Sequence, residues 1–358
     1  MAAKRARSPS PGPAKKKQAI AGTDLGPEMK FKCFRDLLGD LSSTAHEQLL
    51  EDCKTCFTCR EVEDGDNYSL GSTFFVRASD TPSCGMEALA QKIFALHTAG
   101  MEFNPANSGA EWWTQHIDHR DNIGFHWDRD YGLEEDSEMH VHPVVGTVTY
   151  LCVNAGPTVI VDKRGTFPYG ASIEGPLTKC IVSRPIAGKH ITFDGELLHG
   201  APSSLAFPEV DEDAEGLRVT FLVNIWVDHV PIQSERIAED IAGTLKLTAA
   251  AVAPLQLRTG DTERAIAEEY PEDAPTKLHR WGITSAEEDF IIQVALPVTL
   301  RGPQAGSTVD CVLLKDSCIV AGTVSDSDDD GSDDDDEATG EDDDSDDATG
   351  DANDDDED

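Results

Sequence analysis

Three His-x-Asp motifs lie close together in the first half of the chain, at His116/Asp118, His119/Asp121 and His126/Asp128. On a β-strand, residues i and i+2 point to the same face, so each motif can present one imidazole and one carboxylate to a single ion. A lone histidine near an aspartate is more often a surface pair or a capped turn, so no motif predicts a metal site by itself. We favour His126/Asp128, which still requires a third ligand.

The best candidate for this third ligand is His199. It follows a β-rich run that ends at Phe193, and Gly200 permits a tight bend directly after it. Two histidines and one carboxylate on one face of an octahedron are the ligand set of non-haem Fe(II) oxygenases. Zinc accepts the same ligands but is redox-inert, so it cannot activate O2. We interpret a similar pair, His140 and His142, as loop residues.

A charged residue interrupts the apolar strand that we predict at 217–227. Arg218 and Thr220 fall at i and i+2, on one face of this strand. Burying a charge is costly unless it is paired. A guanidinium fork with a neighbouring hydroxyl suits the distal carboxylate of a dicarboxylic acid. The alternative is that Arg218 pairs with a buried Asp or Glu of the protein itself.

The order of these motifs resembles the Fe(II)/2-oxoglutarate-dependent dioxygenases. In this chain a His-x-Asp is followed after about seventy residues by a His, and then by Arg-x-Thr on the next strand. The stretch 147–160 resembles the strand, turn and strand after this motif in prolyl-hydroxylase-like members. The resemblance covers roughly residues 112–227. Prolyl-hydroxylase-like members often have Lys where this chain has Arg218, and residues 203–216 look like an acidic insertion. The resemblance therefore does not identify the substrate.

The resemblance implies a double-stranded β-helix, or jelly roll. It implies Fe(II) bound by His126, Asp128 and His199, and 2-oxoglutarate anchored by Arg218 with help from Thr220 and Tyr150. O2 would be the second co-substrate, and ascorbate is a further candidate cofactor. Succinate and CO2 would form while a C–H bond is hydroxylated, with a protein side chain as the favoured substrate.

Hydrophobic spacing predicts a mainly β fold with flanking helices (α+β). We expect helices at 30–49, 85–97 and 235–251. Short β-rich runs punctuated by Gly and Pro indicate a sandwich or jelly roll. We expect these strands at 112–117, 144–153, 158–161, 180–182, 190–193 and 217–227, and two more at 290–300 and 309–320 that form an extra layer. Lys189 and His190 are expected at a solvated edge. Trp112, Trp113, Trp127 and Trp226 are expected in core or pocket walls.

Two polar tails flank the predicted oxygenase domain, which we assign to 21–324 with its jelly-roll core at about 105–230. Residues 1–20 form a basic tail whose two clusters resemble a nuclear localisation signal, so we expect the nucleus or the cytoplasm. Residues 325–358 form an acidic tail suited to binding basic proteins. Both tails are expected to be disordered.

The net charge of −39 disfavours nucleic-acid binding, because an acidic body repels a phosphate backbone. No apolar run is long enough to cross a membrane. The nine cysteines are odd in number and irregularly spaced, so we expect mostly reduced thiols. Cys53, Cys56 and Cys59 have ligand-like spacing but lack a fourth partner, so ordinary thiols are favoured over a metal site.

Three functions compete at this point. The first is a dioxygenase, the second is a jelly-roll module that binds metal without turnover, and the third is a nuclear acidic protein that acts through its tails. A clustered ligand set and an Arg inside an apolar strand favour the first.

Overall fold

The structure is a computed structural model. It describes residues 29–59, 73–153, 155–165, 172–206, 216–232, 234–265, 267–268, 270, 273–284, 289–298, 300 and 308–324. The predicted basic and acidic tails lie outside these residues. The prediction of a double-stranded β-helix with flanking helices is confirmed by what is described.

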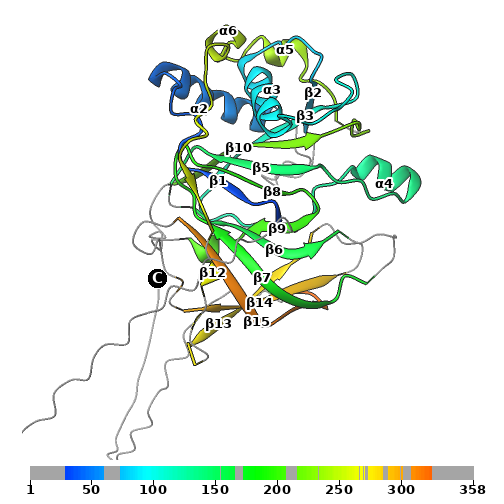
Figure 1. Cartoon of the computed structure of the whole chain (residues 1–358), viewed down its shortest axis with the longest axis vertical. Coiled ribbons are helices and arrows are strands. Elements are labelled where there is room, and N and C mark those ends of the chain that lie inside the picture. Colours follow the sequence, from blue (N-terminus) through cyan, green and yellow to red (C-terminus); the bar gives the residue numbers. More distant parts are fainter. Residues whose placement is uncertain are drawn as a thin grey trace, which may run out of the picture. The chain divides into compact units, whose positions relative to one another are not determined.

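Eight consecutive strands form the centre of the fold (Figure 1). They are β3 (Gly109–Asp118), β4 (Ile123–His126), β5 (Val145–Tyr150), β6 (Thr158–Arg164), β7 (Gly175–Ser183), β8 (His190–Asp194), β9 (Leu197–Ala201) and β10 (Leu217–Trp226). Four of them lie in one sheet in the order β8-β5-β10-β3, and four in the other in the order β7-β6-β9-β4. The chain therefore crosses repeatedly between two antiparallel sheets, which is the topology of a jelly roll.

Helices cover the outer face of the first sheet. This sheet also contains β1 (Lys32–Phe34), β2 (Phe74–Arg77) and β11 (Thr262–Glu263). Helices α2 (Ser43–Thr58) and α3 (Gly85–His97) pack on β3 and β10. On β10, Val219, Phe221, Val223 and Ile225 contact the helices, whereas Leu222 packs inside the barrel. Arg218, Thr220 and Asn224 share the parity of Leu222 and face the interior.

Two of the three predicted helices differ from the structure. The helix at 85–97 is confirmed. The helix predicted at 30–49 is wrong, because residues 32–34 form a strand and α2 begins only at Ser43. The Ser42 hydroxyl accepts a hydrogen bond from Ala45 N and so caps the start of this helix. The helix predicted at 235–251 is also wrong as a single helix. The chain forms two single turns there, α5 (Glu239–Ala242) and α6 (Ala249–Val252), and the Thr248 side chain caps the second of them.

The C-terminal strands continue the second sheet and fold over its outer face. Their bounds are β12 (Ala267–Glu268), β13 (Thr276–Gly282), β14 (Phe290–Pro297) and β15 (Val309–Ala321). The strand order in this sheet is β13-β14-β15-β7-β6-β9-β4. The sheet curls so far that its two ends meet, because Ile283, just after β13, forms a β-bridge with Phe125 of β4. The predicted extra layer is thus part of the same sheet. It encloses a second apolar core that includes Phe125 and Trp281.

None of the helices in the described part of the chain is long and apolar enough to span a membrane.

Candidate metal centre

Alternating side chains around β4 aim two ligands into the barrel. Phe125 and Trp127 are almost fully buried in the apolar core behind the second sheet. His126 and Asp128 have the opposite parity and therefore point into the barrel. The two aromatic side chains anchor the strand from behind, so the sequence Phe-His-Trp-Asp fixes which face the ligands occupy.

His199 lies in the middle of β9, opposite His126 of β4 and Ile160 of β6. The tight bend predicted at Gly200 is wrong, because Gly200 is also within the strand. A Cβ at Gly200 would lie 3.0 Å from both Ile123 O and the Phe125 ring. The glycine thus permits close packing of β9 on β4.

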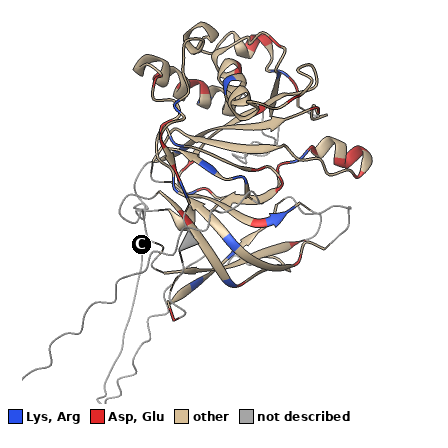
Figure 2. Cartoon of the chain, in the orientation of Figure 1, with Lys and Arg blue, Asp and Glu red and all other residues tan. Residues whose placement is uncertain are grey.

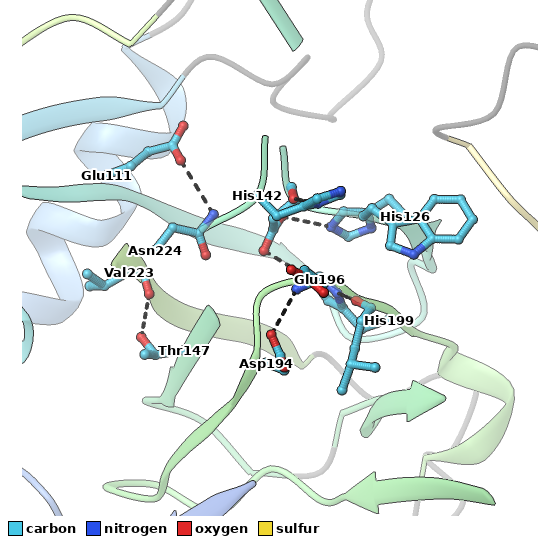
Figure 3. A network of polar contacts seen from close by, with 12 residues as sticks. Glu111, His126, His142, Thr147, Asp194, Glu196, His199, Val223 and Asn224 are labelled. Atoms are coloured by element: carbon cyan, nitrogen blue, oxygen red, sulfur yellow. Dashed lines mark hydrogen bonds and ion pairs between the residues drawn. The ribbon is translucent and has the colours of Figure 1, made fainter. Parts of the chain in front are cut away.

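The three predicted ligands come together at this point. Single ligand atoms of His126, Asp128 and His199 lie within 4.8 Å of one another. His126 Nε2 is 3.6 Å from Asp128 Oδ1, and His199 Nε2 is 3.5 Å from Asp128 Oδ2. Figure 3 shows His126 and His199 close together, and their ring centroids are 4.5 Å apart. No other group of three or more potential ligands is close enough to hold an ion among the residues that the structure describes.

The imidazoles of both histidines have the tautomer that a metal site requires. His126 Nδ1 lies 2.8 Å from Gly124 O, and His199 Nδ1 lies 3.0 Å from Leu197 O. A carbonyl only accepts hydrogen bonds, so each Nδ1 carries the proton and each Nε2 has a free lone pair. Burial lowers the pKa of His199 to about 4, so its imidazole is neutral at pH 7. The residues present therefore fit a divalent cation.

The other two His-x-Asp motifs point elsewhere. His116 lies on β3 with the parity of Trp112 and Thr114, whose side chains contact the helical layer. His119 is buried and donates from Nδ1 to Gly216 O at 2.9 Å, while Asp118 binds Arg120. Neither motif contributes to the group around Asp128.

One residue near the triad was missed by reasoning from the sequence. His142 lies in a loop, as predicted, but its Nδ1 donates to the backbone oxygen of Asp128 at 2.8 Å (Figure 3). This bond helps to fix the chain at Asp128, which lies just beyond the end of β4. Only the short spacing of His140 and His142 hinted at a local role.

Arg218 is buried in the barrel, and its partners there are neutral. Its guanidinium donates to Gly156 O, to Thr158 Oγ1 at 3.4 Å and to Gln115 Oε1 at 3.4 Å. Burial lowers the pKa of Arg218. No carboxylate of the described residues forms an ion pair with it, so the alternative of an internal acidic partner finds no support there. Its positive charge is left uncompensated within the described barrel.

The two predicted assistants of Arg218 lie beside it. The Tyr150 ring centroid is 5.9 Å from the Arg218 guanidinium carbon, and the Tyr150 hydroxyl is 2.7 Å from Thr158 Oγ1. Thr220 instead donates to Gln115 Oε1 at 2.9 Å, so it orients the amide that binds Arg218. Gln115 and Thr158 were missed, because no spacing rule relates them to Arg218.

The solvated edge predicted for Lys189 and His190 is wrong, since both are buried. Lys189 binds Thr308, and burial lowers its pKa to about 8. Thr308 in turn donates to the Glu263 carboxylate. This buried lysine is thus linked to an acid through Thr308, unlike Arg218.

The three cysteines with ligand-like spacing lie on or next to α2. Cys53 and Cys56 are buried in the core under the helices, and burial raises the pKa of both thiols. Cys59 Sγ binds Cys56 O. That they are ordinary thiols rather than metal ligands stays a prediction.

Comparisons with known proteins find similarity of structure only. No family model matches the sequence, and no curated protein matches it. The non-haem α-ketoglutarate-dependent epimerase SnoN from nogalamycin biosynthesis is 13% identical, with a TM-score of 0.34 over 56% of this chain and 79% of that one. HygX from Streptomyces hygroscopicus, with nickel and 2-oxoglutarate bound, is 10% identical, with a TM-score of 0.32 over 64% and 94%. EctD from S. alaskensis is 13% identical, with a TM-score of 0.31 over 58% and 84%.

Proposed function

We propose that this protein is an Fe(II)- and 2-oxoglutarate-dependent dioxygenase, prolyl-hydroxylase-like in its motif order, that hydroxylates a C–H bond. The observation that carries the proposal is the buried Arg218, which has no counter-charge among the described residues and lies on the inner face of the barrel that also holds His126, Asp128 and His199. A scaffold gains nothing from burying a charge without a counter-charge, because desolvation is costly. A binding site for a carboxylate does gain from such a buried charge.

Each residue has a separate task in this proposal. The Nε2 atoms of His126 and His199 and one oxygen of Asp128 would hold Fe(II), and three neutral acceptors hold the Arg218 guanidinium for the distal carboxylate of 2-oxoglutarate. When bound, Fe(II) supplies the activation of O2. One oxygen atom ends in succinate as CO2 is lost, and the other becomes the hydroxyl of the product. The barrel walls exclude water from this reaction.

At neutral pH, His199 and Tyr150 already have the protonation states that this assignment requires. His199 is neutral, as a ligand must be, because burial holds its pKa near 4. Burial also raises the pKa of Tyr150, so its hydroxyl stays protonated and remains a hydrogen-bond donor. A carboxylate entering beside Arg218 thus meets a cation and a neutral phenol.

The test is an anaerobic titration of the full-length chain. Fe(II) and then 2-oxoglutarate are added, the visible charge-transfer band of the chelate is recorded, and succinate is measured after O2 is admitted. We expect the band and succinate in the parent and neither in His199→Ala. His116→Ala is the matched control, because His116 belongs to a motif outside the triad, and it should behave like the parent.

Arg218 is tested with two oxo acids. Arg218→Ala should weaken binding of 2-oxoglutarate by about tenfold or more, since a buried charge-assisted pair is lost. Binding of 2-oxopentanoate, which lacks the distal carboxylate, should not change. Iron bound without the band in the parent would contradict the proposal and leave a metal-binding module. A protein substrate, a nuclear location and capture of basic proteins by the acidic tail remain proposals that need their own experiments.

A further inference from the structure

The side chain of Asn224 is an unexplained polar group in the same barrel. Asn224 lies on β10 six residues beyond Arg218, with the same inward parity, and it is 3% exposed. Its Nδ2 is 3.4 Å from Glu111 Oε2. Its Oδ1 is buried and has no hydrogen-bond partner among the residues that the structure describes. A buried acceptor without a hydrogen bond destabilises the folded state by about 1–3 kcal/mol, so its presence here requires an explanation.

Glu111 determines which end of the amide faces the barrel. The Glu111 carboxylate accepts from Trp226 Nε1 at 2.7 Å and from Ser234 Oγ at 2.8 Å, and Thr73 donates to it as well. An indole N–H only donates, so the carboxylate acts as an acceptor here. Asn224 must therefore turn its NH2 to Glu111 and its oxygen away.

This amide lies on the triad side of the barrel. Figure 3 shows Asn224 between Glu111 and the two imidazoles of His126 and His199. Asn224 pairs with Gly146 of β5, where an added Cβ would lie 2.8 Å from the Phe193 ring. The ring centroid of Phe193 is in turn 4.7 Å from that of His199. An acceptor held here faces the space that a molecule at the triad would enter.

We propose that Asn224, oriented by Glu111, positions the primary substrate by accepting a hydrogen bond from an N–H or O–H group next to the carbon that is oxidised. This inference rests on the proposed function for the meaning of primary substrate. A carboxylate is repelled by the acceptor Oδ1 and attracted by the Arg218 cation, so 2-oxoglutarate is directed toward Arg218 and leaves this corner to the second molecule. The substrate class is thus an amide, an amine or an alcohol rather than a pure hydrocarbon or an acid.

Two small probes of similar shape test the proposal directly. N-methylacetamide has one N–H donor, whereas N,N-dimethylacetamide has none, and both have the same carbonyl acceptor. Their binding to the full-length protein is measured by saturation-transfer NMR. Their distance from the triad is measured from the relaxation of their methyl protons after Mn(II) loading. We expect N-methylacetamide to bind about 2- to 10-fold more tightly than N,N-dimethylacetamide, which is the range of one net hydrogen bond.

The variants decide whether Asn224 causes this preference. In Asn224→Leu, which keeps the volume and removes the acceptor, the two probes should bind equally. Val223→Ala is the control, because its neighbouring side chain faces the helices, and it should keep the preference. Equal binding of both probes to the parent, or a preference that survives in Asn224→Leu, would overturn the inference. Neither probe measurement needs 2-oxoglutarate, so failure of the proposed function shows separately as a missing chelate band.

Discussion

Phe125 stacks on Trp281, with ring centroids 5.3 Å apart and an angle of 23° between the ring planes. Phe125 precedes His126 on β4, and Trp281 lies on β13 in the C-terminal extension. The adjoining backbone is also joined, because Thr284 N donates to Phe125 O at 2.8 Å. The strands after the jelly roll therefore fix the strand that carries His126 and leads directly to Asp128.

Removing this stack should loosen the candidate metal centre as well as the fold. Trp281→Ala should lower the free energy of unfolding by about 3–5 kcal/mol, the usual cost of deleting a buried aromatic side chain. Fe(II) affinity should fall with it, because β4 loses its support from behind. Denaturant unfolding and metal titration measure the two effects. Leu278→Ala, at an exposed position of the same strand, should change neither, and an unaffected metal affinity in Trp281→Ala would disprove the link.

The partners of Arg218 predict the effect of changing Gln115. Gln115→Leu removes one neutral acceptor and should weaken 2-oxoglutarate binding by about 2- to 10-fold, the range of one hydrogen bond. Gln115→Glu should weaken it further, because Arg218 then has an internal carboxylate partner that competes with the ligand. Calorimetric titration with 2-oxoglutarate measures both. A Gln115→Glu variant that binds as well as the parent would show that the charge of Arg218 does not recruit the ligand.

His97 and His190 predict that acid weakens the fold. Their Nε2 atoms are 3.0 Å apart, and burial lowers the pKa of His97 to about 4 and that of His190 well below its usual value. Because these values are lower in the folded state, the unfolded chain binds more protons below about pH 6.5. Stability is therefore unaffected above this pH and decreases as pH falls toward 4. His97 alone should cost about 2 kcal/mol between pH 8 and pH 5.

Urea unfolding at a series of pH values measures this loss. His97→Leu should reduce the slope of stability against pH, since one of the two buried imidazoles is gone. An unchanged slope would show that other groups cause the acid sensitivity.

A buried ion pair secures the beginning of β15 to the end of β7. Arg184 binds Asp310, and both side chains are almost fully buried. Asp310→Ala should destabilise the protein by about 3–5 kcal/mol, because it leaves a buried charge without its partner. The double variant Arg184→Met/Asp310→Leu should recover much of that loss, since it removes both charges. Thermal or denaturant unfolding compares the two, and a double variant no more stable than Asp310→Ala would contradict this account.

Several features of this protein follow from the sequence by itself. Alternation along a strand predicts that His126 and Asp128 share a face, and the apolar run around Arg218 predicts a buried cation. The type of each ligand and the mainly β class follow from composition and periodicity, which are local properties of the chain. Helix α3 was also predicted with its observed bounds because its apolar face repeats at helical spacing.

Only the tertiary structure decided which histidines meet. Periodicity shows that two side chains share a face, but not whether that face looks into the barrel or toward the helices. This is why three His-x-Asp motifs looked alike and only His126/Asp128 faces His199. The neutral partners of Arg218, the burial of Lys189 and the unpaired amide oxygen of Asn224 depend on residues that are far apart in sequence. Contacts of this kind arise from sheet pairing and core packing, which no local pattern encodes.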